Sequence, residues 1–250
     1  IFAESLLTDK TPPGMKGVLH TAEMRKNAIR NIERYDWART EMEQTLARVD
    51  PYLKLSYEEL WQLLPGEKMP RSLVVDPENQ GCPQCGTEIY NQSPQKNRDY
   101  GIFGDPWRFD PFSHPWKIQC PNCQETFPRN DFAAFYQSAL DDKSVYHPAK
   151  GNPKFLQPQD DDPLGKFVDD GRGVTLGGKK WFFAAHYAAL LWVELVQVSR
   201  DLANLYTYTG NEEYARRAGI LLHRMADLYP GMDFMESFKL GMEASSGCTG

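Results

Sequence analysis

Two Cys-Pro-x-Cys motifs constrain this chain more than any other feature. In the first, Cys82 and Cys85 flank Pro-Gln, and in the second, Cys120 and Cys123 flank Pro-Asn. Each tight turn directs two sulfur atoms at one point, and two such turns supply the four thiolates that suit tetrahedral Zn²⁺. The sequence therefore predicts that these four cysteines bind one Zn²⁺ ion.

Other interpretations of the cysteines stay open. Iron or an iron–sulfur cluster also accepts four sulfur ligands. Two disulfides or four unrelated thiols would fit the same residues. A four-cysteine zinc site leaves no coordination position for water, so we expect the metal to be structural and to take no part in catalysis.

The composition narrows the class of protein. The chain has 250 residues, enough for one large domain or two small ones. Hydrophobic residues make up 41% and charged residues 25%, which is ordinary for a soluble globular protein. The formal net charge is −6, whereas nucleic-acid-binding proteins usually carry a basic excess. We therefore expect no nucleic-acid partner.

The two ends of the sequence suggest a longer protein. The chain begins at Ile1, and no charged segment followed by an apolar segment marks a signal peptide. It ends in Ser-Ser-Gly-Cys-Thr-Gly, which resembles a loop within a chain. We expect either a removed leader or an upstream start, and further domains or chain after Gly250. No role is assigned to Cys248.

Residues 1–65 are predicted to form N-terminal helices. After a turn-rich lead-in, an apolar stripe predicts one long helix from Thr21 to Val49, which Asp50-Pro51 ends. Ser56 and Glu59 form a capping-box pattern that opens a short helix.

Residues 66–130 lose the helical periodicity and contain both cysteine pairs. Pro, Gly, Asn, Asp and aromatic residues dominate this stretch, and a short alternating strand, Trp116–Gln119, leads into the second pair. The segment is predicted to be a zinc-ribbon-like insertion that needs its metal to fold, because it has few aliphatic residues.

Residues 131–250 are predicted to be a second helical segment. Asn130 is expected to cap a helix that ends near Leu140. A long loop over 141–180 follows, and its Gly-rich sequence around Asp169, Asp170 and Arg172 favours a functional loop.

A helix from Trp181 to about Tyr208 is apolar on nearly all sides, which indicates a buried helix. Its clean apolar runs are too short for a membrane span, so we expect none. Gly210 ends it and Asn211 caps the next helix, giving a helical hairpin. Such hairpins stack in α-solenoids or close into α/α toroids, and the lack of a fixed repeat argues against a solenoid.

Several motifs together resemble the N-terminal part of the heparinase II/III-like polysaccharide lyases, in the branch with a cysteine-bearing insertion. They occur in order across residues 20–235. The matching stretches are Asn27–Ala38, Ser56–Trp61, Pro128–Tyr136, Asp169–Gly171 and Tyr229–Phe234, together with the two Cys-Pro-x-Cys motifs.

The resemblance implies a mainly α fold, a partial (α/α) toroid with the zinc-ribbon-like insertion, and β-elimination of a uronic-acid polysaccharide. That reaction needs a base for the C5 proton, a group that neutralises the uronate carboxylate, and an acid for the departing O4. The family's catalytic Asn-His and Tyr elements match nothing in this chain, so its catalytic residues are unknown. Relatives are usually exported, which implies a periplasmic or extracellular location.

Five residues are candidates for binding the substrate: Arg172, Lys179, Trp181, His186 and Tyr187. The basic pair could meet a polyanion, and the others could line a groove. The alternative for Arg172 and Lys179 is a solvated loop, and for Trp181 and His186 a place in the core.

Two other functions stay open. The chain could be a non-catalytic, zinc-stapled helical module that binds glycans or a partner chain. An α/α-toroid glycoside hydrolase would need two carboxylates across a groove, and the sequence pairs none of its Asp and Glu residues.

Overall fold

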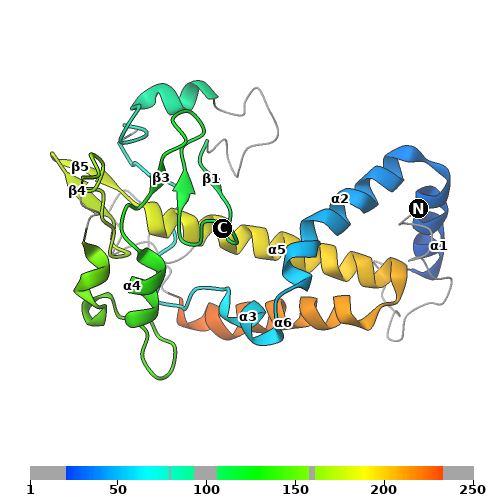
Figure 1. Ribbon diagram of the computed structural model, residues 1–250. Coiled ribbons are helices and arrows are strands. Elements are labelled where there is room, and N and C mark those ends of the chain that lie inside the picture. Colours follow the sequence, from blue (N-terminus) through cyan, green and yellow to red (C-terminus); the bar gives the residue numbers. More distant parts are fainter. Residues whose placement is uncertain (1–20, 79, 93–105, 158–160, 233–250) are drawn as a thin grey trace. The chain divides into compact units, whose positions relative to one another are not determined.

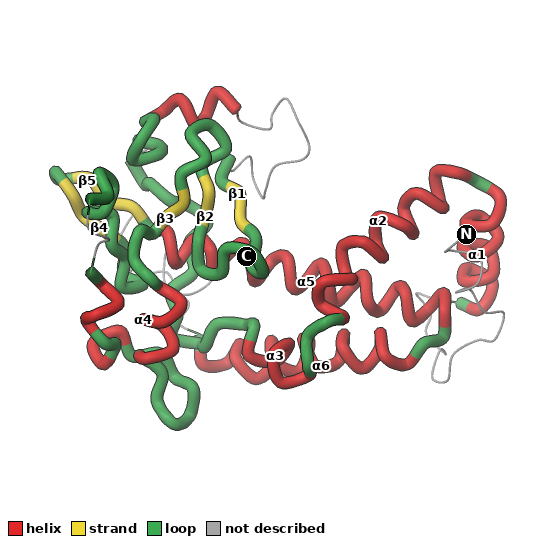
Figure 2. The backbone as a smooth tube through the Cα atoms, in the orientation of Figure 1, coloured by secondary structure: helices red, strands yellow, loops and turns green. Residues whose placement is uncertain are grey.

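The computed structural model describes residues 21–78, 80–92, 106–157 and 161–232 (Figure 1). Over these residues the fold is mainly α-helical with a few short strands (Figure 2), which confirms the predicted class. The chain divides into two compact units, here called unit 1 and unit 2. Unit 1 consists of Ile1–Leu64 and Glu194–Asp227, and unit 2 of Pro65–Val193 and Leu228–Gly250. The predicted boundaries near residues 65 and 130 and the predicted toroid stay predictions.

Unit 1 begins with two helices where one was expected. Helix α1 (Ala22–Arg34) and helix α2 (Asp36–Leu53) are separated by Tyr35, whose backbone is extended at φ −120° and ψ 129°. The Tyr35 carbonyl starts α2 by accepting bonds from two of its amides, and the Arg39 guanidinium donates to the Glu33 carbonyl at the end of α1 (3.1 Å). The prediction of a single helix to Val49 is therefore wrong, because these local bonds cap both helices at a position without Gly or Pro.

Helix α3 (Tyr57–Gln62) begins at the predicted capping box. The Glu59 amide donates to the Ser56 hydroxyl (3.2 Å), and the Glu59 carboxylate accepts from the Ser56 amide (2.7 Å). This reciprocal pair satisfies two amides that a helix start would otherwise leave without partners.

The predicted helical hairpin is confirmed. Helix α5 (Phe183–Thr209) ends at Gly210, which has φ +69° and donates its amide to the Tyr206 carbonyl (2.8 Å). Helix α6 (Glu212–Leu228) then begins where the Asn211 side chain accepts from the Glu213 amide (3.0 Å). No helix among the described residues is both long enough and apolar enough to cross a membrane.

Unit 2 combines short helices, two small sheets and the first part of α5. Strands β1 (Arg108–Phe109), β2 (Ile118–Gln119) and β3 (Thr126–Phe127) form an antiparallel sheet, and β4 (Val174–Leu176) pairs with β5 (Lys179–Trp181). The helical segments are η1 (Thr87–Gln92), α4 (Phe132–Ser138), η3 (Pro148–Lys150), η4 (Pro153–Leu156) and η5 (Tyr229–Gly231).

An aromatic core joins these pieces of unit 2. Phe132, Phe135 and Tyr136 of α4 pack with Tyr146 and the small residues Ala184 and Ala188 of α5. The small side chains on α5 let the aromatic rings approach the helix closely, and this packing explains why the start of α5 is apolar on all sides.

Two predictions for unit 2 are wrong in detail. The cap of α4 is Asp131, whose carboxylate accepts from the Ala134 amide (3.0 Å), and not Asn130. Residues 174–181, expected as loop and helix, form a β-hairpin whose turn holds Gly177 and Gly178 at φ +59° and +77°. Two successive residues with positive φ match a tight hairpin turn that glycine adopts without strain.

Candidate metal centre and ligand groove

The two cysteine motifs fold into matching turns. In the first, the Cys82 and Gly86 backbones exchange hydrogen bonds of 3.0 and 2.8 Å. In the second, the Gln124 amide donates to the Cys120 carbonyl (2.9 Å). Gly86 and Gln124, each directly after the second cysteine of its motif, have φ values of +60° and +62°. A left-handed residue therefore follows the second cysteine in both turns.

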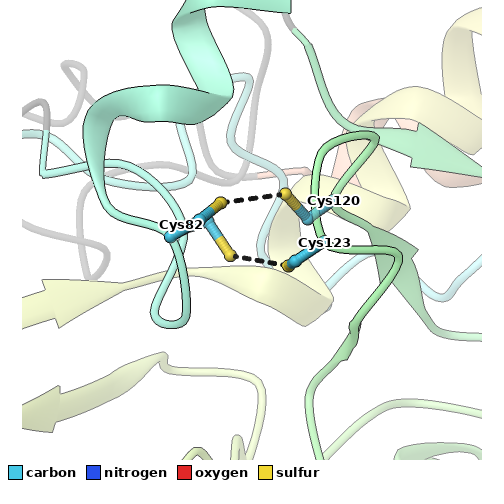
Figure 3. A group of neighbouring side chains, drawn as sticks. Cys82, Cys120 and Cys123 are labelled. Carbon is cyan, nitrogen blue, oxygen red and sulfur yellow. Dashed lines mark hydrogen bonds between the residues drawn. The ribbon is translucent and has the colours of Figure 1, made fainter.

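The four predicted cysteines meet at one place, as Figure 3 shows for the sulfur atoms of the cluster. The Sγ atoms of Cys82 and Cys123 are 3.6 Å apart, and those of Cys85 and Cys120 are 3.5 Å apart. All four lie within 4.8 Å of one another, and each thiol is free. These separations are far longer than a disulfide bond of about 2.05 Å. The cluster can therefore hold a metal ion.

The thiols perturb one another. Hydrogen bonds, first of all with Cys82, lower the pKa of Cys120 to about 5, whereas burial raises the pKa of Cys123 to about 11. The pKa of Cys82 is raised by its interaction with Cys120 and by burial. Four adjacent thiolates repel each other, so a bound cation is what would keep all of them ionised.

The first turn is anchored to the rest of unit 2 through Gly81. Its carbonyl accepts from the Trp181 indole (2.9 Å), and its amide donates to the Asp76 carboxylate (2.7 Å). At φ +77° a Cβ on Gly81 would lie 2.1 Å from the Gly86 carbonyl oxygen, so only glycine fits. Trp181 thus belongs to the support of the metal centre.

The predicted functional loop is organised around Asp169, which is fully buried. Its carboxylate accepts from the amides of Gly171 (2.7 Å), Gly173 (2.9 Å) and Ala184 (3.1 Å). The Asn130 side chain bonds both the amide and the carbonyl of Asp169 at 3.0 Å. Asp169 therefore holds the loop against α4 and caps the start of α5.

Three of the five predicted binding residues are buried in unit 2. Trp181 is 6% exposed, His186 0% and Tyr187 2%. His186 Nδ1 lies 3.0 Å from the Ser72 carbonyl, and the Tyr187 ring packs against the rings of Phe109 and Trp116. These positions match the core interpretation of Trp181 and His186.

The other two predicted residues are exposed. Arg172 follows the Asp169 loop, where its amide donates to the Asp170 carboxylate (2.9 Å), and Lys179 begins β5 beside the hairpin turn. Burial thus separates the five residues into two sets, and their predicted role in binding stays a prediction.

Unit 1 contains a groove that the sequence did not predict. It has a volume of about 670 Å³ and lies between α1, α2 and α5. Amide, carboxylate, guanidinium and aromatic side chains line it. The lining residues are Ala28, Asn31, Ile32, Trp37, Ala38, Glu41, Met42, Thr45, Arg48, Gln197, Arg200, Asp201, Asn204 and Tyr208. We call it the α2–α5 groove.

A hydrogen-bonded network holds the polar side chains of the α2–α5 groove. Arg48 pairs with the buried carboxylate of Asp201 (2.7 Å), which also accepts from the Gln197 amide (2.8 Å). Arg200 in turn donates to Gln197. Trp37 is 64% exposed and stacks with Tyr35 at 6.3 Å. The groove thus offers an accessible aromatic ring beside preorganised polar groups.

Sequence patterns alone hardly indicate this groove. Arg39, Glu41 and their neighbours fit the solvated face of a helix, and Trp37 fits a helix as well as a binding surface. The available signal was a large aromatic residue on a face otherwise occupied by charged residues.

A scan against protein-family models, a search of curated proteins and a search of solved structures found no match to this chain. The function is therefore argued from the geometry of the metal centre and the α2–α5 groove.

Proposed function

We propose that this chain is part of a polysaccharide lyase that cleaves a uronic-acid polysaccharide by β-elimination, and that the α2–α5 groove receives the polymer. The observation that carries the proposal is the composition of the groove. Exposed Trp37 suits the apolar face of a sugar ring, and the amides and carboxylates suit its hydroxyl groups. The resemblance of the ordered motifs to heparinase II/III-like lyases supports the same reaction.

The groove also offers positive charge for a uronate. Arg200 lines it and is exposed, and a guanidinium binds a carboxylate through two parallel hydrogen bonds. Arg48 also lines the groove but already pairs with Asp201. Neutralising the uronate carboxylate makes the adjacent C5 proton more acidic, which is the central requirement of the elimination. In this proposal Arg200 binds and orients the uronate, and no residue is assigned as the base.

We further propose that the cysteine cluster binds Zn²⁺ and stabilises unit 2. Four sulfur atoms at about 2.3 Å from a tetrahedral zinc lie about 3.8 Å from each other. The Cys82–Cys123 and Cys85–Cys120 distances of 3.6 and 3.5 Å are close to that value. The Gln84 amide also donates to the Cys82 sulfur (3.4 Å), and such a hydrogen bond orients a metal-binding sulfur.

One observation favours the second candidate, a non-catalytic glycan-binding module. A tyrosine that abstracts a proton needs a lowered pKa. Burial raises the pKa of Tyr146, Tyr187, Tyr208 and Tyr214, and a hydrogen bond to Glu213 raises that of Tyr57. These five tyrosines are therefore poor candidates for the base.

The test is to incubate the protein with alginate, glycosaminoglycans, ulvan and pectin and to follow the ultraviolet absorbance of the unsaturated uronate product. The proposal expects absorbance to grow with at least one polymer. Binding to a polyanion column with no product from any polymer would contradict lyase activity and favour the glycan-binding module.

Variants test whether the α2–α5 groove is the site. Trp37→Ala should weaken polymer binding by about tenfold or more, because it removes the stacking surface. Trp37→Phe keeps an aromatic ring and should retain most of the binding. Unchanged binding by Trp37→Ala would place the polymer elsewhere.

A further inference from the structure

A second depression in unit 1 lies between α3 and α6. Its volume is about 380 Å³. The lining residues are Tyr57, Glu58, Trp61, Arg216, Gly219, Ile220 and His223. We call it the α3–α6 pocket, and it shares no lining residue with the α2–α5 groove.

The aromatic side of the pocket is held rigidly. Tyr57 and Trp61 are one turn apart on α3 and therefore share a face. The Trp61 ring meets the His223 ring edge-on at 5.1 Å, and the Arg224 guanidinium lies 5.1 Å from the Trp61 centroid. Two contacts from α6 thus hold the Trp61 ring, and a ring held in place loses little entropy when a ligand stacks on it.

Tyr57 is fixed in the same way. Its hydroxyl donates to the Glu213 carboxylate (2.6 Å), which also accepts from Arg217 (2.6 Å). Arg217 is buried and donates to the carbonyls of Tyr52 and Leu55, both at 2.8 Å. Tyr57 remains 40% exposed. Its hydroxyl is therefore held by Glu213 while part of the side chain stays accessible to solvent.

The charged groups of the pocket fit a ligand with both an anionic group and hydroxyl groups. Arg216 is exposed and lies 5.9 Å from the Tyr57 centroid, where it could pair with a carboxylate or sulfate. Glu58 of α3 also lines the pocket and could accept hydrogen bonds from sugar hydroxyl groups. Aromatic rings complete the match to a sugar that bears one acidic group.

Gly219 leaves room for a ligand in the α3–α6 pocket. It lies inside α6, where glycine destabilises a helix, and its φ is not positive. A Cβ at this position would meet no atom of the described residues within 4 Å, apart from the backbone of its own helix. Gly219 therefore leaves open space at the pocket, and a larger residue could occupy that space without a backbone penalty.

We infer that the α3–α6 pocket is a second carbohydrate site, which binds a single acidic sugar residue through stacking on Trp61 and Tyr57 and ion pairing with Arg216. The inference goes beyond the proposed lyase activity and holds whether or not the chain cleaves a polymer. It concerns recognition of one sugar ring at a position separate from the α2–α5 groove.

The test is a titration of the ¹⁵N-labelled full chain with sodium glucuronate, galacturonate and mannuronate, with neutral glucose as the control. The indole N–H signals are assigned with Trp61→Phe and Trp37→Phe. The inference expects at least one uronate, and not glucose, to shift the Trp61 signal. A Trp61 signal that no uronate moves, or that glucose moves equally, would overturn it.

Two variants at Gly219 separate the pocket from the fold. Gly219→Leu fills the floor and should weaken uronate binding by about tenfold or more, whereas Gly219→Ala should bind nearly as the original chain does. Both should keep or raise the Tm, because both residues favour a helix more than glycine does. Equal binding by Gly219→Leu, or a Tm lowered by that variant because another segment occupies the pocket, would contradict the inference. Trp37→Ala should leave this titration unchanged, so failure of the α2–α5 proposal is read out separately.

Discussion

A single residue, Asp169, links several segments of unit 2. Its buried carboxylate joins the loop at Gly171 and Gly173 to the first turn of α5, while Asn130 holds its backbone from the α4 side. The side chain reaches the helix start from fourteen positions earlier in the chain, so it acts as a cap that local sequence rules do not anticipate. Around Asp169, the loop that was predicted to be functional supports the start of α5.

The ionisation of Asp169 predicts a specific pH dependence of stability. Burial raises its pKa to about 6, despite the three amides that favour the charged form, whereas an unfolded Asp titrates near about 3.9. Between these values the folded protein binds more protons, so the free energy of unfolding should decrease as pH rises from about 4 to about 6 and then level off. The total decrease should be at most about 3 kcal/mol.

Urea denaturation at several pH values checks this dependence. Asp169→Asn should flatten the curve between pH 4 and 6, while Asp161→Asn, at an exposed position with φ +67°, should keep it. A slope that survives in Asp169→Asn would assign the pH dependence to another group.

The capping box of α3 gives a second prediction at this scale. Ser56→Ala removes the hydroxyl that accepts from the Glu59 amide and should lower the free energy of unfolding by about 1 kcal/mol. Glu59→Gln keeps a side chain that can accept from the Ser56 amide and should have a smaller effect. Equal losses in both variants, measured by denaturant unfolding, would show that the carboxylate charge matters more than the cap.

At the scale of elements, sequence rules succeeded where the determining contacts are local. The Ser56 box, the Gly210 stop and the Asn211 cap each depend on residues within one turn, and all three were predicted. The metal cluster was predicted because two tight turns with cysteines at fixed spacing have few other uses. The break at Tyr35 is also made by local bonds, but they come from Arg39 and from amides of α2, and no Gly, Pro or capping pattern in the sequence announces them.

The α2–α5 groove could not have been predicted, for a related reason. Its floor depends on Arg48 of α2 meeting Asp201 of α5, residues that are far apart in sequence. The burial of Trp181, His186 and Tyr187 likewise depends on the packing of unit 2 around the start of α5, and for Trp181 and His186 the sequence had left the core open as an alternative. Such outcomes require tertiary contacts.

Metal removal should loosen more than the cysteine turns. The Phe127 ring of β3 stacks on Phe183 at the start of α5 (4.9 Å), and Trp107 contacts the same ring. Hydrogen exchange on Cys82→Ser or after chelation should therefore show lost protection over residues 80–92 and 106–130 and over the first turn of α5. The helices of unit 1 should keep theirs.

The matched control for that experiment is Cys248→Ser, which changes a cysteine that belongs to neither Cys-Pro-x-Cys motif. It should leave the exchange pattern unchanged. Loss of protection throughout α1, α2 and α6 in Cys82→Ser would show that unit 1 depends on the metal centre as well.

At the scale of the whole molecule, support and recognition fall in different units. Unit 2 contains the cysteine cluster, the Asp169 network and most of the buried aromatic rings, while unit 1 contains both the α2–α5 groove and the α3–α6 pocket. The four cysteines leave no coordination position for a substrate, so the proposed zinc contributes to folding, and glycan recognition is proposed for the helical unit.

If the four cysteines bind one structural zinc ion, metal analysis and zinc X-ray absorption spectroscopy of the purified full chain should detect it. We expect one zinc per chain with four sulfur neighbours at about 2.3 Å. A chain that lacks stoichiometric zinc, or a zinc whose shell includes nitrogen or oxygen in place of a cysteine sulfur, would contradict it.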